Sequence, residues 1–518
     1  MVGSGFGAAA PALRMASAGF QVLIIEKGTN IDPGRDFHQT QDPKYLLKYI
    51  KTIRGDNVNF TFAEGLGGGS GFYEMASFRA PSKAFEQRDP GGIRLWPAGL
   101  SRAIMNPYYE TAERMMCVTQ IAAGRVPKTG LAFSLLMKRL GYSVDRAPYS
   151  VRDCAGHSFC VAGCSRGSKV TLHDTYLLPA RWAGAEILTN IEALSISVLF
   201  SEDGQAGQKR SIINLPYRYE VLCRNTLNGE TLRIRAKILV LGGGTVGTAK
   251  LLLRSRLQLR LLSRQIGRNI AVNGTVKSLG ILPDGLIEGD MFVGQSHPGV
   301  ISYEFLEKRG ITISTAKPLP VDAVSYANLV LEGETRPHPW WGEPKVELMK
   351  LYRRRALVMF ALGLTTPAAE LHLQRNGELA SAFHLDESFR AYYRSTLKLL
   401  HSIFRRNGAR VVHIRIIDGQ GNEYPDLHIT TAHMTGSCRM ADSPAQGVVD
   451  SSGEVFNYPG MYITDGASVP SSLAVNPYLT ILANAERMAD LLVHRYVGRT
   501  IRDMKLQSES KPEKENIA

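Results

Sequence analysis

The chain has 518 residues, of which 44% are hydrophobic and 21% charged, the proportions of an ordinary soluble globular protein with room for two domains. No run of 18 apolar residues occurs, so the sequence predicts no transmembrane helix, and no nucleic-acid-binding motif occurs, so we expect no nucleic-acid partner. The formal net charge of +14 is spread along the chain, which fits a cytoplasmic protein or, as an alternative, peripheral association with anionic membrane lipids.

The chain opens on a glycine-rich turn, Gly3-Ser-Gly-Phe-Gly-Ala8. Residues 11–18 are expected to form the helix after the turn, and Phe20–Ile25 is an apolar, β-branched strand that ends in Glu26. A strand should also precede such a turn, but only two residues stand there, with no signal peptide. We therefore expect the first strand to be largely missing, as if the start of the chain had been lost.

This series of turn, helix, strand and acid is typical of a dinucleotide-binding site. Gly3 and Gly5 allow a tight turn and a close approach of the backbone to a pyrophosphate, and Ala8 is small enough for the helix to pack on the strand. The start of the helix offers free N–H groups to the phosphates. Glu26 stands where an acid accepts hydrogen bonds from the adenosine ribose. The series does not by itself distinguish FAD from NAD.

A second glycine cluster, Glu64-Gly-Leu-Gly-Gly-Gly-Ser70, follows some 40 residues later. So many glycines disfavour both helix and strand. The cluster indicates either a close approach of the backbone to a flat ligand or a flexible loop, and its spacing does not decide between the two.

A third glycine cluster, Gly242, Gly244 and Gly247, follows a strand expected over Arg235–Leu241 and opens a helix expected over 248–256. It could mark a second dinucleotide, such as NADPH. However, no strand tipped by an acid or an arginine follows about 20 residues later. We therefore favour the interpretation that this turn covers the same dinucleotide as the first.

Three of the six cysteines, Cys154, Cys160 and Cys164, lie close together in the sequence, with His157 between them. The spacing lacks the paired Cys-x-x-Cys of zinc ribbons and the common iron–sulfur patterns. We expect a turn-rich loop with buried thiols and no metal.

The C-terminal part holds a histidine and an asparagine that could act together. His433 lies beside a turn of small residues, and Asn476 precedes Pro477, which biases it towards an extended conformation. A neutral imidazole and an amide can hold one hydroxyl group, the first accepting its proton and the second orienting its oxygen. A short strand is expected over Met461–Thr464 and an amphipathic helix over Thr480–Val493, and the polar tail from Met504 is expected to be disordered.

With these motifs, the chain resembles the glucose–methanol–choline (GMC) oxidoreductase family, and within it the cholesterol oxidase and long-chain alcohol oxidase branches. The matching segments are the opening Gly-x-Gly-x-x-Ala, the Gly67–Ser70 loop, Pro107–Glu113, Cys164–Tyr176, Leu241–Ser255 and the block 433–489.

The resemblance implies an α/β fold: a Rossmann-type FAD-binding domain, its first strand largely missing, and a discontinuous α+β substrate domain built on a β-sheet. The FAD-binding domain is expected to comprise residues 1–80, 180–295 and 430–503, the substrate domain 81–179 and 296–429, and a tail 504–518.

The resemblance also implies FAD as the cofactor and His433 and Asn476 as the catalytic pair. Some members bind FAD covalently through a histidine near the glycine loop, and none stands between His38 and His157 here, so we expect non-covalent FAD. The expected cofactor contacts are Gly3, Gly5, Phe6, Gly7, Ala8, Glu26, Gly67, Gly68, Gly69, Ser70, Ala193, Gly242, Gly243, Asp465, Gly466, Asn476, Pro477 and Tyr478.

The expected activity is oxidation of an alcohol, His433 taking the hydroxyl proton while hydride passes to the flavin, with O2 or a dehydrogenase acceptor taking the electrons. The resemblance implies an apolar substrate, a sterol or a long-chain alcohol, and Tyr478 is similar to the aromatic residue of steroid-oxidising relatives. No residue can be matched to the active-site glutamate of those relatives: Glu304 and Glu307 lie in the right stretch at best, so the sequence does not support steroid isomerisation. The alternatives are a non-redox or light-driven flavoenzyme on the same fold, and an inactive homologue that lacks FAD.

Overall fold

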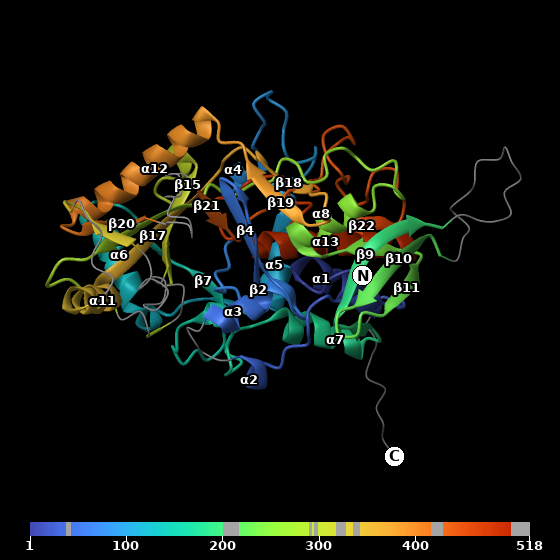
Figure 1. Ribbon diagram of the computed structural model, residues 1–518, viewed down its shortest axis with the longest axis horizontal. Helices are drawn as coiled ribbons and strands as arrows, with labels where there is room; N and C mark the ends of the chain where they lie inside the picture. Colours follow the sequence, from blue (N-terminus) through green and yellow to red (C-terminus); the bar gives the residue numbers. More distant parts are fainter. Residues whose placement is uncertain are drawn as a thin grey trace, which may run out of the picture.

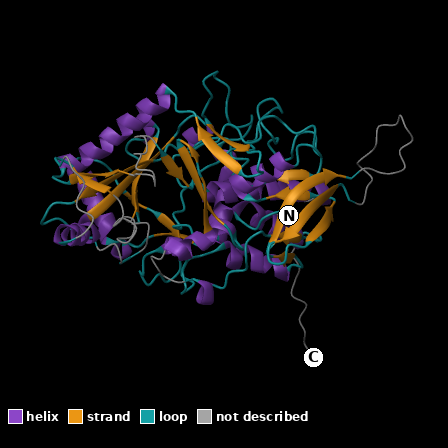
Figure 2. Ribbon diagram, viewed as in Figure 1, coloured by secondary structure: helices purple, strands orange, loops and turns teal. Residues whose placement is uncertain are grey.

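The computed structural model describes residues 1–37, 43–199, 217–289, 293–294, 299–316, 328–334, 342–415 and 428–498. A parallel sheet and a three-stranded sheet lie at one end of the long axis, near the N-terminus, and a seven-stranded sheet lies at the other (Figure 1). Helices α1 (Phe6–Ser17), α5 (Arg102–Met115) and α13 (Tyr478–Val497) lie between them (Figures 1 and 2).

The parallel sheet has the order β8 (Glu186–Leu188), β1 (Leu23–Ile25), Val2, β12 (Leu239–Leu241) and β22 (Met461–Ile463). Val2 forms parallel bridges to Ile25 on one side and to Leu241 on the other. The first strand is thus as short as the sequence predicted. Its remaining residue Val2 still occupies the central position of a Rossmann-type sheet.

Helices α1 and α13 cover this sheet and are joined by a buried ion pair. Arg14 donates from Nε and Nη2 to the two carboxylate oxygens of Glu486 (2.8 and 2.7 Å), and the Tyr176 hydroxyl donates to the same carboxylate (2.8 Å). Removing one partner of such a pair leaves a buried charge uncompensated. The pair therefore fixes how the two helices pack. The α13 helix is buried along most of its length, where the sequence indicated an amphipathic one.

Residues 235–241, predicted as one strand, belong to two. The strand β11 (Thr231–Ala236) pairs with β10 (Tyr219–Asn225), which also pairs with β9 (Ile191–Val198), whereas β12 is a fully buried strand of the parallel sheet. The alternating exposure of β11 is that of an edge strand with one solvated face. The prediction of one strand was wrong because both segments favour β-structure. They are distinguished only by the sheets in which they pair.

Six of the seven strands of the largest sheet come from the second half of the chain, where the sequence indicated a less regular region, and the seventh comes from the first half. Its order is β16 (Asn328–Leu331), β20 (Arg410–Arg415), β13 (Val276–Ile281), β17 (Ala356–Gly363), β15 (Ile311–Ala316), β14 (Val300–Ser302) and β6 (Asp145–Arg146), all antiparallel. Helices α6 (Lys128–Arg139) and α12 (Glu387–Arg406) pack on one face, and α11 (Glu343–Arg355) covers part of the other.

Smaller elements connect these units. They are α2 (Pro33–Asp36), α3 (Pro43–Tyr49), β2 (Ile50–Ile53), β3 (Gly55–Asp56), β4 (Val58–Ala63), α4 (Ser82–Phe85), β5 (Val118–Gln120), β7 (Pro148–Ser150), a π-helical turn (His173–Leu177), α7 (Leu178–Trp182), α8 (Gly244–Arg254), α9 (Leu306–Arg309), β18 (Ala369–Leu373), β19 (Leu379–Phe383) and β21 (Ile429–Thr431), with short 3-10 turns at Gly68–Gly71, Ala123–Arg125 and Cys160–Ala162.

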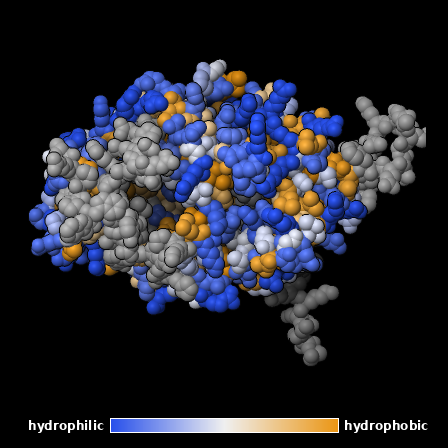
Figure 3. All heavy atoms as spheres, in the orientation of Figure 1, coloured by the Kyte–Doolittle hydropathy of each residue, from blue (hydrophilic) through white to orange (hydrophobic). Residues whose placement is uncertain are grey.

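The face seen in Figure 3 is mostly hydrophilic, with scattered apolar residues between the hydrophilic ones. Throughout the described ranges, each helix is too short or too polar to cross a lipid bilayer. The tail expected to be disordered lies outside the described residues.

Candidate active site

Three glycine segments meet at the carboxyl end of the parallel strands. A Cβ added to Gly3 would lie 2.5 Å from the Gly242 carbonyl oxygen, and one added to Gly242 would lie 2.5 Å from the Ala8 Cβ. The backbone N–H of Gly67 donates to Ser4 Oγ (2.9 Å), so the loop of the second cluster packs on the first turn. All three clusters found in the sequence thus lie together, and the approach of the loop at residues 64–70 to a flat ligand stays a prediction.

Gly5 differs from its neighbours because the space beside it is open. A Cβ on Gly5 would meet only the Cα of Gly68, at 3.9 Å. Gly5 is the N-cap of α1, and that end has no side-chain cap. Among the described residues, the backbone N–H groups of Gly5, Phe6 and Gly7 donate to no acceptor. Free N–H groups beside open space at a helix start suit a phosphate.

Gly7 holds α1 against the loop that follows β22. A Cβ on Gly7 would lie 2.3 Å from the Cβ of Asp465. Pro11 has no N–H to donate to the Gly7 carbonyl one turn back, and that carbonyl instead accepts a hydrogen bond from Thr464 Oγ1 (2.7 Å). The proline inside the helix therefore frees the acceptor that anchors this contact.

Glu26 lies at the end of β1, as predicted, and is buried. Its Oε2 accepts from the backbone N–H (3.0 Å) and hydroxyl (2.7 Å) of Ser4, and its Oε1 accepts from Gly28 N (2.8 Å). Burial raises the pKa of this carboxyl, and the hydrogen bonds oppose the rise. Ala193 is half-buried on β9, two residues beyond Ile191, whose N–H donates to the Glu26 carbonyl (2.8 Å). Glu26 and Ala193, both expected to contact the cofactor, therefore lie at the same end of the sheet.

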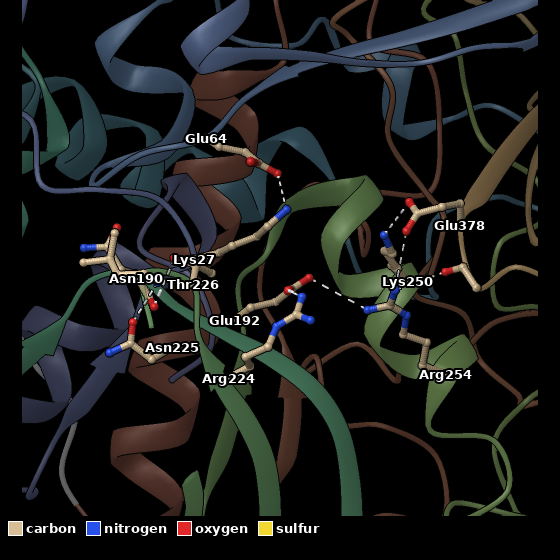
Figure 4. A network of polar contacts seen from close by, with 12 residues as sticks. Lys27, Glu64, Asn190, Glu192, Arg224, Asn225, Thr226, Lys250, Arg254 and Glu378 are labelled. Atoms are coloured by element: carbon tan, nitrogen blue, oxygen red, sulfur yellow. Dashed lines mark hydrogen bonds and ion pairs between the residues drawn. The ribbon is translucent and has the colours of Figure 1, made fainter. Parts of the chain in front are cut away.

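Ion pairs surround this end of the site (Figure 4). Lys27 pairs with Glu64 across the glycine loop (2.8 Å), and Glu192, next to Ala193, accepts from Arg224 (2.7 Å). The network continues through α8 to the β18–β19 hairpin, where Lys250 pairs with Glu378 (3.0 Å). Such partly exposed pairs contribute little stability individually, but they fix the relative positions of the elements around Glu26.

The carboxylate of Asp465 accepts hydrogen bonds from three groups of the protein. Its Oδ2 accepts from Gly244 N (2.7 Å) and Thr248 Oγ1 (2.6 Å), at the start of α8, and its Oδ1 accepts from Ala467 N (2.8 Å). Burial raises its pKa to about 6. Gly466 is buried, and Gly243, the N-cap of α8, is exposed. The contact of Asp465 and Gly466 with the ribityl–phosphate region stays a prediction.

An aromatic cluster joins the first turn to the C-terminal segment. The ring centroids of Phe6 and Tyr73 both lie 5.0 Å from that of Tyr478. The Tyr478 hydroxyl is hydrogen-bonded to Ser150 Oγ (2.7 Å) and to Ser77. Tyr478 is the first residue of α13 and follows the N-cap Pro477, so the cluster holds the segment that carries Asn476.

The structure brings His433 and Asn476 into contact. Asn476 Nδ2 lies 3.3 Å from His433 Nε2, and both side chains keep accessible surface. An amide nitrogen can only donate, so the bond requires an unprotonated Nε2 with its lone pair turned towards Asn476. Burial, with a contribution from Lys277, lowers the pKa of His433 to about 4.

Sequence reasoning missed Asn273, which holds the loop before Asn476. The Asn273 Oδ1 accepts from the backbone N–H groups of Leu473 and Ala474 (both 2.9 Å), and its Nδ2 donates to the Val475 carbonyl (2.8 Å). Ala474 has a positive φ of 55°, a conformation that costs energy in a residue other than glycine. The only signal in the sequence was an Asn-Gly pair, which is typical of any turn.

We expect Asn273→Ala to lower the free energy of unfolding by about 2–4 kcal/mol, because it leaves three buried backbone groups without partners. It should also slow the reaction at His433, because Asn476 loses its support. Thermal unfolding and flavin reduction measure the two effects. Asn407→Ala is the matched control: this buried asparagine holds the Leu136 and Ile403 carbonyls (3.1 and 2.9 Å), so its loss should affect stability alone. Flavin reduction at the wild-type rate in the folded Asn273→Ala protein would contradict the positioning role.

Other sequence candidates lie away from this site. Glu304 accepts from Ser143 (3.0 Å) and Glu307 pairs with Lys83 (2.8 Å), both on the surface. Cysteines 154, 160 and 164 form no disulfide in the described part of the chain and are half-buried, where the sequence predicted buried thiols. The same described residues show no cluster of three or more metal-binding side chains. The expectation that the purified protein carries no metal stays a prediction, which elemental analysis can test.

The structure thus combines a glycine-lined turn on a Rossmann-type sheet with a histidine–asparagine pair, which is an arrangement that suits a dinucleotide-dependent enzyme. Models of the GMC oxidoreductase family match residues 15–273 and 377–485. The chain is 25% identical to a long-chain-alcohol oxidase of Arabidopsis thaliana, covering 96% of this chain and 68% of that protein. It is 24% identical to a cholesterol oxidase of Mycobacterium tuberculosis, over 95% and 90%. Its fold matches the crystal structure of pyridoxine 4-oxidase from Mesorbium loti, with a TM-score of 0.62 and 16% identity over 96% and 98% of the two chains.

The chain belongs to the GMC oxidoreductase family. The expected family, fold class and enzyme class, an oxidoreductase acting on the CH–OH group of donors, are thereby confirmed. Members of the family are FAD-binding flavoproteins. The domain boundaries stated above stay a prediction.

Proposed function

We propose that this protein binds FAD non-covalently and oxidises an alcohol, with His433 as the base and Asn476 as the group that orients the substrate oxygen. The observation that carries the proposal is the contact between His433 Nε2 and Asn476 Nδ2. In this contact the Asn476 amide donates to the Nε2 lone pair, so a substrate hydroxyl that replaced the contact would meet an acceptor and a donor side by side.

The residues around the glycine-lined turn fit FAD. The open space at Gly5 and the free N–H groups at the start of α1 would take the pyrophosphate. Glu26 has a free lone-pair position on Oε1, which could accept a ribose hydroxyl, since only Gly28 donates to that atom. No histidine lies near the Gly67–Ser70 loop in the sequence, which supports non-covalent binding.

The roles of the two side chains follow from their hydrogen-bonding capacity. A substrate hydroxyl between them would donate its proton to His433 Nε2 and accept a hydrogen bond from Asn476 Nδ2. Bound flavin supplies the acceptor for the hydride that leaves the carbinol carbon. The chain's own part is to fix the hydroxyl and to take its proton.

The names of the two sequence relatives support an apolar alcohol, a sterol or a long-chain alcohol, as the substrate. Because both names are those of oxidases, we propose O2 as the electron acceptor. We also propose localisation in the cytoplasm, with peripheral contact to a membrane as the alternative that the basic net charge would favour.

The proposal is tested by adding alcohols to the purified yellow protein without oxygen. Bleaching of the flavin absorbance by an alcohol is the expected result. A flavin-loaded protein that no sterol, long-chain alcohol or polar alcohol bleaches would favour a non-redox or light-driven reaction on this fold. A colourless protein that takes up no added FAD would indicate an inactive homologue.

The lowered pKa of His433 predicts an unusual pH profile. A base with a pKa of about 4 is already unprotonated throughout the neutral range, so flavin reduction should be independent of pH from about 5.5 to 8. The rate should decline only below about pH 5, as the ring becomes protonated. Stopped-flow reduction with a non-ionising alcohol measures this profile. An inflection near pH 6.5, the ordinary value for histidine, would show that His433 is not buried in the working enzyme.

A further inference from the structure

Two leucines that follow the C-terminal end of α8 are unusually exposed. Leu257 is 84% exposed, more than any other large hydrophobic side chain in the described part of the chain, and Leu261 is 65% exposed. Single exposed leucines are common on protein surfaces. Two that lie so close together in the sequence leave apolar surface in water, which is unfavourable unless a partner covers it.

The fold holds these leucines outwards. We call residues 255–268 the arginine–leucine turn. Leu259, between the two exposed leucines, is fully buried. The Leu261 N–H donates to the hydroxyl of the buried Tyr458 (2.9 Å), and the Leu261 carbonyl accepts from Asn457 Nδ2 (3.2 Å). The backbone is thus anchored on both sides of Leu261, and the two side chains are presented without any rearrangement.

The arginine–leucine turn is also strongly basic and lacks counter-charges. Its exposed arginines are Arg256, Arg260, Arg264 and Arg268. Among the described residues none of them forms an ion pair, whereas Arg254, the last residue of α8, pairs with Glu192 and Glu378 (3.8 and 3.9 Å). No Asp or Glu occurs in the sequence between Glu230 and Asp284. The positive charge of this surface is therefore not neutralised by its own chain.

The helix itself explains only part of this charge. A cation near the C-terminus of a helix interacts favourably with the helix dipole within the last turn. This accounts for Arg254, but Arg260, Arg264 and Arg268 lie beyond that range. Like charges gathered on one surface repel one another, so the cluster is unfavourable until an anionic partner approaches.

The combination of charge and apolar surface indicates which partner fits. An acidic protein surface would pair with the arginines, but it would leave the protruding leucines without an apolar environment. The surface of an anionic membrane offers both: lipid phosphates for the arginines, and the boundary of headgroups and acyl chains for the leucines. The observations therefore favour a lipid surface.

The arginine–leucine turn lies away from the candidate active site. Helix α8 begins at Gly244, whose N–H donates to Asp465 (2.7 Å), and it has 11 residues. At the rise of an α-helix its other end lies about 16 Å away. A partner bound at the turn would therefore leave the glycine segments around Gly5 accessible to a cofactor.

We propose that the arginine–leucine turn docks this protein on an anionic lipid membrane, with Leu257 and Leu261 entering the headgroup region and the four arginines pairing with lipid phosphates. The inference goes beyond the proposed activity and does not depend on it. It assigns a particular surface to the membrane contact that was named above as the alternative localisation.

The test is co-sedimentation of the purified protein with vesicles of phosphatidylcholine, alone or mixed with the anionic phosphatidylglycerol. The wild type should bind the mixed vesicles and not the neutral ones. Arg260→Gln/Arg264→Gln should bind the mixed vesicles about 10- to 30-fold more weakly, since each basic residue near an anionic surface contributes about fivefold. Leu257→Ser/Leu261→Ser should weaken binding about 10-fold or more, because it removes the apolar contact.

Two control variants match these changes at other places on the surface. Arg309→Gln/Arg406→Gln removes two exposed arginines from α9 and α12, and Leu47→Ser/Leu227→Ser removes leucines that are 66% and 78% exposed. Both should bind as the wild type does. All five proteins should unfold at the same temperature and reduce flavin equally with a soluble alcohol, so loss of docking is separate from loss of the proposed activity.

Three results would overturn the proposal: a wild type that does not bind the mixed vesicles, unchanged binding in Leu257→Ser/Leu261→Ser, or equal weakening in the arginine variant and its control. The last would show that net charge alone attracts the protein. A wild type that binds polyglutamate but no vesicles would also overturn it, and would assign the turn to an acidic protein partner.

Discussion

Replacing His433 with alanine should slow anaerobic flavin reduction by an alcohol about 10²–10⁴-fold, the usual contribution of a positioned proton acceptor. FAD should stay bound, because the described contacts of His433 are with Thr431 and Asn476 and not with the glycine segments. The rate of flavin reduction should fall less in Asn476→Ala, since this substitution removes an orienting hydrogen bond but leaves the base. Single-turnover bleaching, with FAD content measured by absorbance, gives both rates.

The matched control is His372→Ala, which removes an exposed imidazole from β18 and should reduce flavin at the wild-type rate. Unchanged bleaching in a fully loaded His433→Ala protein would exclude the proposed base and, with it, this mechanism of alcohol oxidation. A rate that declines only in proportion to lost FAD would show that His433 packs the segment before α13 instead.

The parts of this site that could be predicted from the sequence are those set by local geometry. Gly5, Ala8 and Glu26 stand at fixed spacings within one turn, one helix and one strand, so their arrangement follows from the backbone alone. The small size of Ala8 is explained by its contact with Gly242. Local geometry alone does not place the third glycine cluster. Its position beside the first cluster depends on the pairing of Val2 with Leu241, which are far apart in the sequence.

The parts that could not be predicted depend on contacts between distant segments. Asn273 acts on residues 473–475, about 200 positions later in the chain, and no local pattern marks that contact. The short first strand was recognised, but the sequence could not show that Val2 would pair on both sides.

Gly5→Val should abolish stable FAD binding while leaving the fold intact. The valine methyl groups would enter the open space beside α1, where only Gly68 approaches, and would exclude a phosphate from the free N–H groups. Losing two charge-assisted hydrogen bonds weakens binding by about 10²–10⁴-fold. The apoprotein should lose at most about 1 kcal/mol of stability, because Gly5 has an ordinary φ of −74° and valine is only a poorer N-cap. Flavin absorbance after purification, FAD titration and thermal unfolding of the apoprotein measure these effects.

A second variant, Gly7→Ala, distinguishes an effect on cofactor binding from an effect on packing. Gly7 lies in α1, two residues after Gly5, but it faces the protein and not the open space. Its Cβ would lie 2.3 Å from that of Asp465, a distance that the buried loop after β22 must relieve by moving. This variant should therefore lose stability and FAD together, whereas Gly5→Val should lose FAD alone. A Gly5→Val protein as yellow as the wild type would place the phosphates elsewhere. A Gly5→Val apoprotein as unstable as Gly7→Ala would show that the space beside Gly5 serves the fold and not the cofactor.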